Sequence, residues 1–378
     1  MKVKRGLALT AAVVWAIVML ATTGPASGVV SKLFVSTAQF KAMGFNLLRG
    51  QPALLSPRGN NVFWVDKTSN KYEIPKGHVF RLTTMHLDWT TGKVTLQKMW
   101  LPTTNLDNLN ISADGRTIAG VSDRGTRVFV VDVATQTSKV IYVKEKGKPS
   151  FDVSPSYVWM EKGMIMCPGI FFDSTNTALG DYIVSIDPSK TGYAAIKKVR
   201  NMNPITHHAP GGFQWQQYFD ANESYFATME ADPLHPTHLY YGDGNELRLI
   251  DKTFAIGGMA VGQDRIVYCA RYRQAHGLVY GLTVFDQMTG KKYHIGSPDI
   301  PYSYLYMSHD GRTILATRLH LHARTMSVYY GREGSDFNLR QVPGLHGVRP
   351  GVIRFSRDGS TVEFMGPRGM SVQRLPQN

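Results

Sequence analysis

Four histidines in the middle of the chain are the densest group of side chains that could bind a metal ion. His207 and His208 precede a pair of glycines, and His235 and His238 stand three residues apart in a Pro-rich segment. Imidazole nitrogens are ligands for Zn²⁺ and Cu²⁺, so these four residues are candidate metal ligands. A surface loop whose imidazoles are solvated or contact a partner explains the same pattern. We favour the surface loop, because the second pair has no flanking Cys and only one nearby carboxylate.

The segment around the second histidine pair predicts a contact with another protein. Residues 232–245 are expected to form a long loop between two strands, and long ordered loops in compact domains tend to be functional. Its apolar and aromatic side chains would form an exposed patch on an isolated domain. We therefore predict that a partner chain, rather than a metal ion, contacts Leu234, His235, His238, Tyr240 and Tyr241.

A second basic group lies nearer the C-terminus. His320 and His322 alternate along a predicted strand, so both rings would point to one face, together with Arg318 and Arg324. Such a stripe could hold an anionic sugar or a haem propionate through guanidinium contacts. A surface stripe that keeps the protein soluble explains the pattern without a ligand, and we favour that interpretation.

Other motifs that would indicate an enzyme do not occur in the sequence. The two cysteines, Cys167 and Cys269, have apolar neighbours and are expected to be buried free thiols. Neither belongs to a C-x-x-C-H motif, which excludes covalent c-type haem in this chain. There is no nucleophile elbow, phosphate-binding loop, zincin motif or EF-hand loop. No catalytic residue and no cofactor-binding residue can therefore be assigned.

The charge balance is basic, with 42 Lys and Arg against 28 Asp and Glu and a formal net charge of +14. Nucleic-acid-binding proteins cluster such charge on one face or along one helix. The basic residues here are spread along the chain. We therefore expect no nucleic-acid partner.

The first 28 residues resemble a signal peptide. Lys2, Lys4 and Arg5 precede an apolar run over residues 7–21, and small residues before position 29 suit cleavage after Gly28. An uncleaved membrane anchor is the alternative. Either interpretation predicts export to the periplasm or the exterior. No later apolar stretch is long enough to span a bilayer, so no membrane span is expected after cleavage.

The rest of the chain repeats a short turn signature. Its clearest copies read Ser-x-Asp-Gly at residues 112–115, 308–311 and 356–359, each between two apolar segments. In such a turn Asp bonds neighbouring backbone amides, and Gly takes the positive φ that other residues avoid. Weaker copies occur at residues 56–59, 160–163, 219–222 and 262–264.

This spacing predicts an all-β fold, a seven-bladed β-propeller. The seven turns recur about every 50 residues, and propeller blades of four strands repeat at similar periods. The last unit ends early, whereas residues 33–38 read as a strand with no unit of its own. We predict that this N-terminal strand closes the ring and removes an open sheet edge. Residues 29–378 would then be a single propeller domain; an open β-sandwich is the alternative.

In length and predicted blade number, the chain resembles the oligogalacturonate lyase propellers. That resemblance implies a secreted sugar-acid lyase or a carbohydrate-binding protein with a pocket of His and Arg. The lyases place Gln and His ligands for a divalent metal near a His-Pro-His run before a turn of this type. Here His320-Leu321-His322 follows such a turn instead.

In size, predicted blade number, lack of a haem motif and abundance of Met and His, the chain also resembles the β subunit of hydrazine synthase. That resemblance implies a haem-free propeller beside α and γ subunits that carry c-type haem, in a heterotrimer that can dimerise. The complex condenses nitric oxide and ammonium to hydrazine in the anammoxosome lumen, as part of anammox nitrogen metabolism. It implies a scaffolding or assembly role for this chain, with no catalytic residue and no cofactor of its own.

Overall fold

A computed structural model gives the three-dimensional arrangement of the chain. It describes residues 17–18, 31–42, 50–67, 80–101, 108–122, 127–143, 150–153, 158–172, 175, 177–201, 219–222, 225–232, 235–242, 247–274, 277–298 and 300–376. In this part of the chain, antiparallel strands form seven sheets, most of them with four strands.

The first three sheets come from the N-terminal half. The first contains β3 (Gly50–Leu55), β4 (Asn61–Lys67), β5 (Phe80–Leu87) and β6 (Val94–Trp100), with β1 (Ile17–Val18) added beside β6. The second contains β7 (Asn108–Ile111), β8 (Thr117–Ser122), β9 (Arg127–Asp132) and β10 (Thr137–Tyr142). The third contains β11 (Ser150–Val153), β12 (Trp159–Glu161), β13 (Met164–Phe172), β14 (Ala178–Ile186) and β15 (Ile196–Asn201), and the short helix η2 (Gly192–Ala195) precedes β15.

The other four sheets follow in chain order. The fourth contains β16 (Phe219–Asn222), β17 (Tyr225–Asp232), β18 (His235–Gly242) and β19 (Leu247–Thr253). The fifth contains β20 (Ala255–Val261), β21 (Arg265–Gln274), β22 (Gly277–Asp286) and β23 (Lys292–Ile295). The sixth contains β24 (Tyr302–Met307), β25 (Thr313–His320), β26 (Thr325–Arg332) and β27 (Arg340–Gln341), with η3 (Glu333–Ser335) after β26. The seventh contains β28 (Val352–Phe355), β29 (Thr361–Gly366) and β30 (Gly369–Arg374).

The seventh sheet takes its fourth strand from the other end of the chain. β2 (Lys32–Ser36) pairs antiparallel with β30, from Lys32 opposite Gln373 to Ser36 opposite Gly369. The strand is shorter than the predicted 33–38, because α1 (Thr37–Ala42) begins directly after it. Ser36 and Gln39 cap this helix reciprocally: the Ser36 N–H donates to Gln39 Oε1 at 2.7 Å, and the Gln39 N–H donates to Ser36 Oγ at 3.2 Å.

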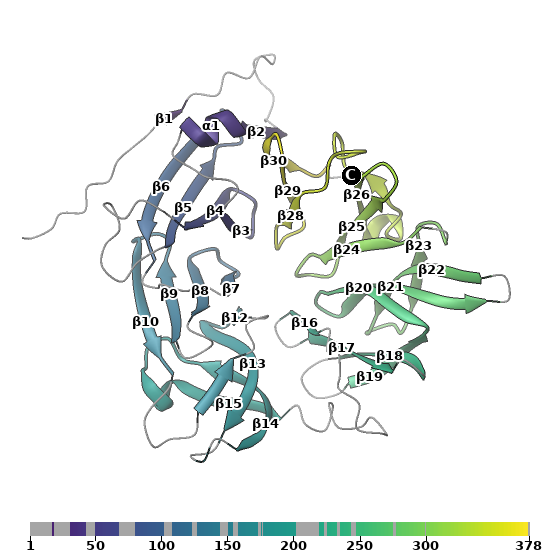
Figure 1. Ribbon diagram of the computed structural model, residues 1–378, viewed down its shortest axis with the longest axis horizontal. Coiled ribbons are helices and arrows are strands. Elements are labelled where there is room, and N and C mark those ends of the chain that lie inside the picture. Colours follow the sequence, from purple (N-terminus) through teal and green to yellow (C-terminus); the bar gives the residue numbers. More distant parts are fainter. Residues whose placement is uncertain are drawn as a thin grey trace, which may run out of the picture.

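The sheets follow one another around the molecule in the order of the chain (Figure 1). The purple N-terminal strands and the yellow C-terminal strands therefore lie side by side, and β28 contacts β3. Apolar side chains fill the space between neighbouring sheets. In the cluster between the last and first sheets, Leu33, Val35 and Met370 pack with Val62 and Met85.

The predicted Ser-x-Asp-Gly turn chemistry is confirmed. In the turn at 308–311, Ser308 Oγ donates to Asp310 Oδ1 at 2.6 Å and accepts the Thr313 N–H at 2.9 Å. Asp310 Oδ1 also accepts the Arg312 N–H at 3.0 Å, and Gly311 has a φ of 69°. The turns at 112–115 and 356–359 repeat these contacts. The signature thus joins the first two strands of a sheet by bonds within the turn itself.

Backbone hydrogen bonds also join these turns from one sheet to the next. The Gln263 N–H donates to His309 O at 2.7 Å, the His309 N–H to Arg357 O at 2.7 Å, and the Asp358 N–H to Pro57 O at 3.0 Å. Sheets five, six, seven and one are therefore linked in succession. One weaker prediction is wrong, since residues 219–222 form strand β16 rather than a turn.

Candidate functional site

The four candidate metal ligands do not form a site in the described structure. His207 and His208 lie outside the described residues. His235 and His238 both lie on β18. Among the residues that the structure describes, no three His, Cys, Asp or Glu side chains lie close enough together to hold a metal ion.

The prediction of a long loop over residues 232–245 is wrong. β17 ends at Asp232 and β18 begins at His235, so a tight hairpin replaces the loop. The Pro-rich composition suggested a loop, but burial alternates along this segment. Thr237, Leu239 and Tyr241 are buried, and the residues between them are half-buried. Period-two alternation of this kind is typical of a strand with one face in the core.

This hairpin also corrects the predicted partner contact. Tyr241 is 1% exposed, and its hydroxyl donates to Gly262 O at 3.2 Å, so it belongs to the core and cannot contact a partner. His238 and Tyr240 are half-buried, with their rings edge to face at 6.4 Å, and contact of a partner with these two stays a prediction. Leu234 and the side chain of His235 lie outside the described residues.

The predicted basic stripe is broken by the end of its strand. β25 ends at His320, and residues 321–324 form a turn in which Arg324 has a φ of 50°. His322 therefore does not lie beside His320 on one strand face. The prediction was wrong because Leu321 continues the apolar pattern of the strand, although it stands at the tip of the turn with 79% of its surface exposed.

His320 is instead part of a hydrogen-bonded chain with a histidine that sequence reasoning missed. The buried hydroxyl of Ser327 lies 2.9 Å from His320 Nε2 and 3.0 Å from His346 Nδ1, and it accepts the Gly347 N–H at 3.3 Å. A hydroxyl donates one proton, so one of the two rings accepts it and the other donates. Burial lowers the pKa of His320, and Arg318 and His346 lower it further. These hydrogen bonds hold both imidazole rings in fixed orientations.

His346 lines a groove between the sixth and seventh sheets. The groove has a volume of about 1060 Å³. One wall is the segment that follows β27, and the other wall and floor come from β2, β29, β30 and the β29–β30 turn. The lining residues are Lys32, Phe34, Gly344, Leu345, His346, Gly347, Val348, Arg349, Phe364, Gly366, Pro367, Arg368, Gly369 and Ser371. Four of them are basic, and none of the described lining residues is acidic.

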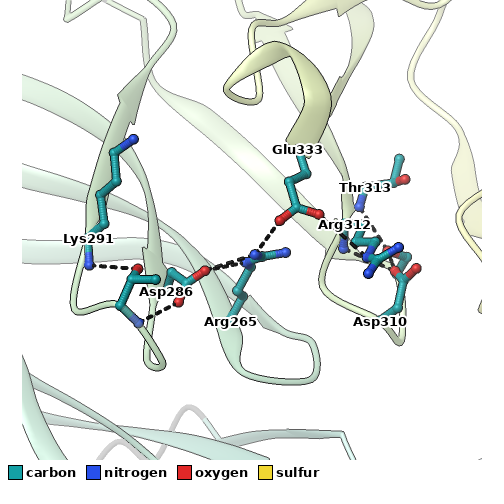
Figure 2. Close-up of polar contacts among 9 residues, drawn as sticks. Arg265, Asp286, Lys291, Asp310, Arg312, Thr313 and Glu333 are labelled. Carbon is teal, nitrogen blue, oxygen red and sulfur yellow. Dashed lines mark hydrogen bonds and ion pairs between the residues drawn. The ribbon is translucent and has the colours of Figure 1, made fainter. Parts of the chain in front are cut away.

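At the junction between the fifth and sixth sheets, by contrast, the charges are paired (Figure 2). Arg265 Nε donates to Asp286 Oδ2 at 2.8 Å, and an Nη of Arg265 lies 2.5 Å from Glu333 Oε1. Arg312 Nε lies 3.4 Å from the other carboxylate oxygen of Glu333. Asp286 is almost fully buried, so Arg265 compensates a charge that the core encloses. This cluster therefore holds the two sheets together.

The other buried titratable groups described here also contribute to the packing of the sheets rather than to a reactive site. The hydroxyls of Tyr268 and Tyr272 both donate to Asp251 Oδ2, at 2.6 and 2.8 Å, between the fourth and fifth sheets. Cys167 and Cys269 are buried free thiols as predicted, and burial raises the pKa of each. A thiol whose pKa is raised is a poor nucleophile at neutral pH.

Solved structures share the fold of this chain. No protein-family model matches the sequence, and no curated protein matches it. An oligogalacturonate lyase in complex with manganese is 14% identical over 86% of this chain and 88% of that chain, with a TM-score of 0.54. The oligogalacturonate lyase of Vibrio parahaemolyticus is 10% identical over 97% of each chain, with a TM-score of 0.53. Hydrazine synthase of Kuenenia stuttgartiensis is 12% identical over 86% of this chain and 95% of that chain, with a TM-score of 0.48.

These comparisons show a generic β-propeller fold, built of antiparallel sheets of mostly four strands. Identities of 10–14% show the fold alone, because one fold carries many functions. Within the described residues, no helix has the length and apolar character needed to cross a bilayer.

Proposed function

We propose that this chain is a haem-free propeller subunit that assembles with partner chains of an exported enzyme complex. The observation that carries the proposal is the placement of exposed apolar side chains. Tyr142, Val199 and Leu249 are 43–53% exposed, and each stands on the outermost strand of its sheet. Large apolar and aromatic side chains are enriched in the buried centres of protein interfaces. The outermost strands β10, β15 and β19, rather than the β17–β18 hairpin, are therefore the proposed docking surface.

The sequence resemblance to the β subunit of hydrazine synthase suggests the complex. In that case, the partners are α and γ subunits that carry c-type haem, the reaction is hydrazine formation from nitric oxide and ammonium, and the location is the anammoxosome lumen. The signal-peptide pattern of residues 1–28 supports export. This chain would contribute assembly rather than catalysis, and the mature protein would be the single domain over 29–378.

We also propose that the seven sheets are the blades of one closed ring. The pairing of β2 with β30 along its whole length supports N-terminal closure. The hydrogen bond from Asp358 to Pro57, which joins the seventh sheet to the first, supports it independently. Closure covers the edge of β30 that would otherwise be unpaired.

Purification of the native complex tests the proposal. The chain is expected to co-elute with haem-carrying subunits at fixed stoichiometry, whereas the recombinant chain alone shows no Soret band. The double variant Tyr142→Ser/Leu249→Ser is expected to lose partners without a change in melting temperature, since both side chains are exposed. Tyr304→Ser is the matched control, because Tyr304 is 57% exposed but stands on β24, at the edge of its sheet opposite to the outermost strand.

Two results would contradict the proposal. One is a Soret band in the pure recombinant chain, which would place haem in this subunit. The other is an intact complex in the double variant, or an equal loss of partners in the Tyr304 control.

A further inference from the structure

We propose that the groove between the sixth and seventh sheets binds an acidic oligosaccharide, with carboxylate or sulfate groups on sugar rings. The inference does not depend on the proposed assembly role, because it rests on a different surface. It is carried by the charge of the groove, the shape of its floor and the hydrogen-bonded histidine in its wall.

The charge of the groove favours an anion. Lys32, Arg349 and Arg368 have exposed side chains, and they line the groove together with His346. None of the described lining residues is a carboxylate that could neutralise them, unlike the paired charges around Arg265. Guanidinium groups bind carboxylates and sulfate-like oxyanions by paired N–H donors.

The spacing of the cations favours a ligand with several anionic groups. Lys32 begins β2, whereas Arg368 stands in the turn beside the other end of that strand, where Ser36 lies opposite Gly369. The two ends of a five-residue strand are about 13 Å apart, given a rise of about 3.3 Å per residue. An oligomer with an acidic group on successive rings can place one group near each end of the strand, whereas a single inorganic oxyanion contacts both cations only if both side chains turn toward it.

The floor of the groove offers an apolar surface with one polar group. Phe34, Ser371 and Phe364 lie directly opposite one another on β2, β30 and β29, so their side chains form one row on the same face. Phe34 is 46% exposed. Ser371 is 93% buried by the same measure (7% exposed), and its hydroxyl has no hydrogen-bond partner among the described residues. A pyranose ring, which has an apolar face and hydroxyl groups at its edge, matches such a row.

His346 adds a hydrogen-bonding ring nitrogen to the wall. Its Nδ1 lies 3.0 Å from Ser327 Oγ, which leaves Nε2 as the nitrogen that a ligand can reach. If Ser327 donates its proton to Nδ1, the neutral ring carries its own proton on Nε2 and donates it outward. Ser327 Oγ then accepts hydrogen bonds from His320 Nε2 and from the Gly347 N–H, so each polar group of this hydrogen-bonded network has a partner.

A peptide is a poorer match than a sugar for this floor. β30 is hydrogen-bonded to β29 on one side and to β2 on the other. Its backbone groups are therefore occupied, and the amides of a peptide lying on the row would lack partners. Sugar hydroxyls also bond to water at the open side of the groove.

Equilibrium binding to the full chain tests the inference. The probes are an oligogalacturonate, a neutral malto-oligosaccharide of equal length, sodium sulfate and a poly-glutamate peptide. The oligogalacturonate is expected to bind most tightly, with an affinity that falls as salt rises. The variant Arg349→Gln/Arg368→Gln should weaken that binding at least about tenfold, because it removes two charge-assisted hydrogen-bonding groups.

Two further variants keep the test specific. Arg340→Gln removes the same charge from β27, outside the groove, and should leave binding unchanged. Phe34→Ala should weaken oligogalacturonate binding but not sulfate binding. Equal binding of the neutral sugar, tighter binding of poly-glutamate or sulfate, or the same loss in Arg340→Gln as in the groove variant would overturn the inference.

Discussion

The junction between the fifth and sixth sheets and the junction between the sixth and seventh sheets both contain arginines, but they use them differently. Arg265 lies between Asp286 and Glu333, and its side chain is 15% exposed. Arg349 and Arg368 line an open groove, and no carboxylate occurs among the described residues that line it. Two neighbouring junctions of the same kind of sheet thus differ in whether their positive charge is compensated.

This difference separates charge that serves folding from charge that is available to a ligand. A buried carboxylate such as Asp286 is costly unless a cation pairs with it, so the Arg265 cluster is required by the packing. Exposed cations without counter-ions cost little to keep and gain little for stability. The stability of the fold therefore does not explain why these cations are grouped in one groove.

Breaking the compensated junction should have the largest effect. Arg265→Met leaves Asp286 buried without its cation, and the free energy of unfolding is expected to fall by about 4 kcal/mol. Urea unfolding followed by tryptophan fluorescence measures it. Arg312→Gln, at a side chain that is 70% exposed in the same cluster, should cost less than about 0.5 kcal/mol. Equal losses in the two variants would show that burial of Asp286 is not the cause.

A buried carboxyl without compensation should make stability depend on pH. Burial raises the pKa of Glu363 from 4.5 to about 7, and nearby Arg354 offsets only part of this. Because the folded state holds the proton more tightly, this group stabilises the fold below pH 4.5. That contribution, about 3 kcal/mol, is lost as pH rises through about 7.

Glu363→Gln removes this titration. The variant should lose less stability than the parent chain between pH 5 and 8, when both are measured by urea unfolding at each pH. Glu333→Gln, at a half-exposed glutamate, is the control for a general charge effect and should keep the parental slope. A parental pH profile in Glu363→Gln would contradict the assignment.

The turn signature should contribute less than either buried charge. Ser356→Ala removes the hydroxyl that donates to Asp358 and accepts the Thr361 N–H, and leaves that buried amide without its bond. The expected loss is about 1–2 kcal/mol. Ser360→Ala removes a more exposed hydroxyl from the same aspartate and should cost about 0.5 kcal/mol or less. A larger loss in Ser360→Ala would contradict the proposed order.

The smallest effect is expected in the groove. Arg349→Gln/Arg368→Gln should leave the melting temperature of the free protein nearly unchanged, within about 0.5 kcal/mol of unfolding free energy. Differential scanning fluorimetry measures it. A clear loss of stability would mean that these arginines serve the fold as Arg265 does, and would remove the distinction between the two junctions.

The sequence predicts the local parts of this fold well. The signature at 112–115 predicts a hairpin because Ser, Asp and Gly make their contacts within six residues, and β7 and β8 are the two apolar segments on either side of it. The strand at β2 was also predictable, because an alternating segment with no repeat unit of its own needs a partner.

What depends on tertiary packing could not be predicted in the same way. Prolines at 233 and 236 suggested a loop, whereas the buried alternation of Thr237, Leu239 and Tyr241 made a strand. The groove brings together residues 32 and 349, which are 317 positions apart, and no local pattern relates them. His346 carries no signal of its own, since its role arises only from its distance to Ser327.

The backbone bonds between successive turns have a consequence for how this fold tolerates mutation. The groups that link one sheet to the next are the main-chain atoms of Gln263, His309, Arg357, Asp358 and Pro57, so most side chains at the linking positions are free to change. Only the serine, the aspartate and the glycine of each turn are constrained, the first two by their side-chain hydrogen bonds and the glycine by its positive φ. The sequence can therefore change at most of these positions while the main-chain bonds that link successive sheets are kept.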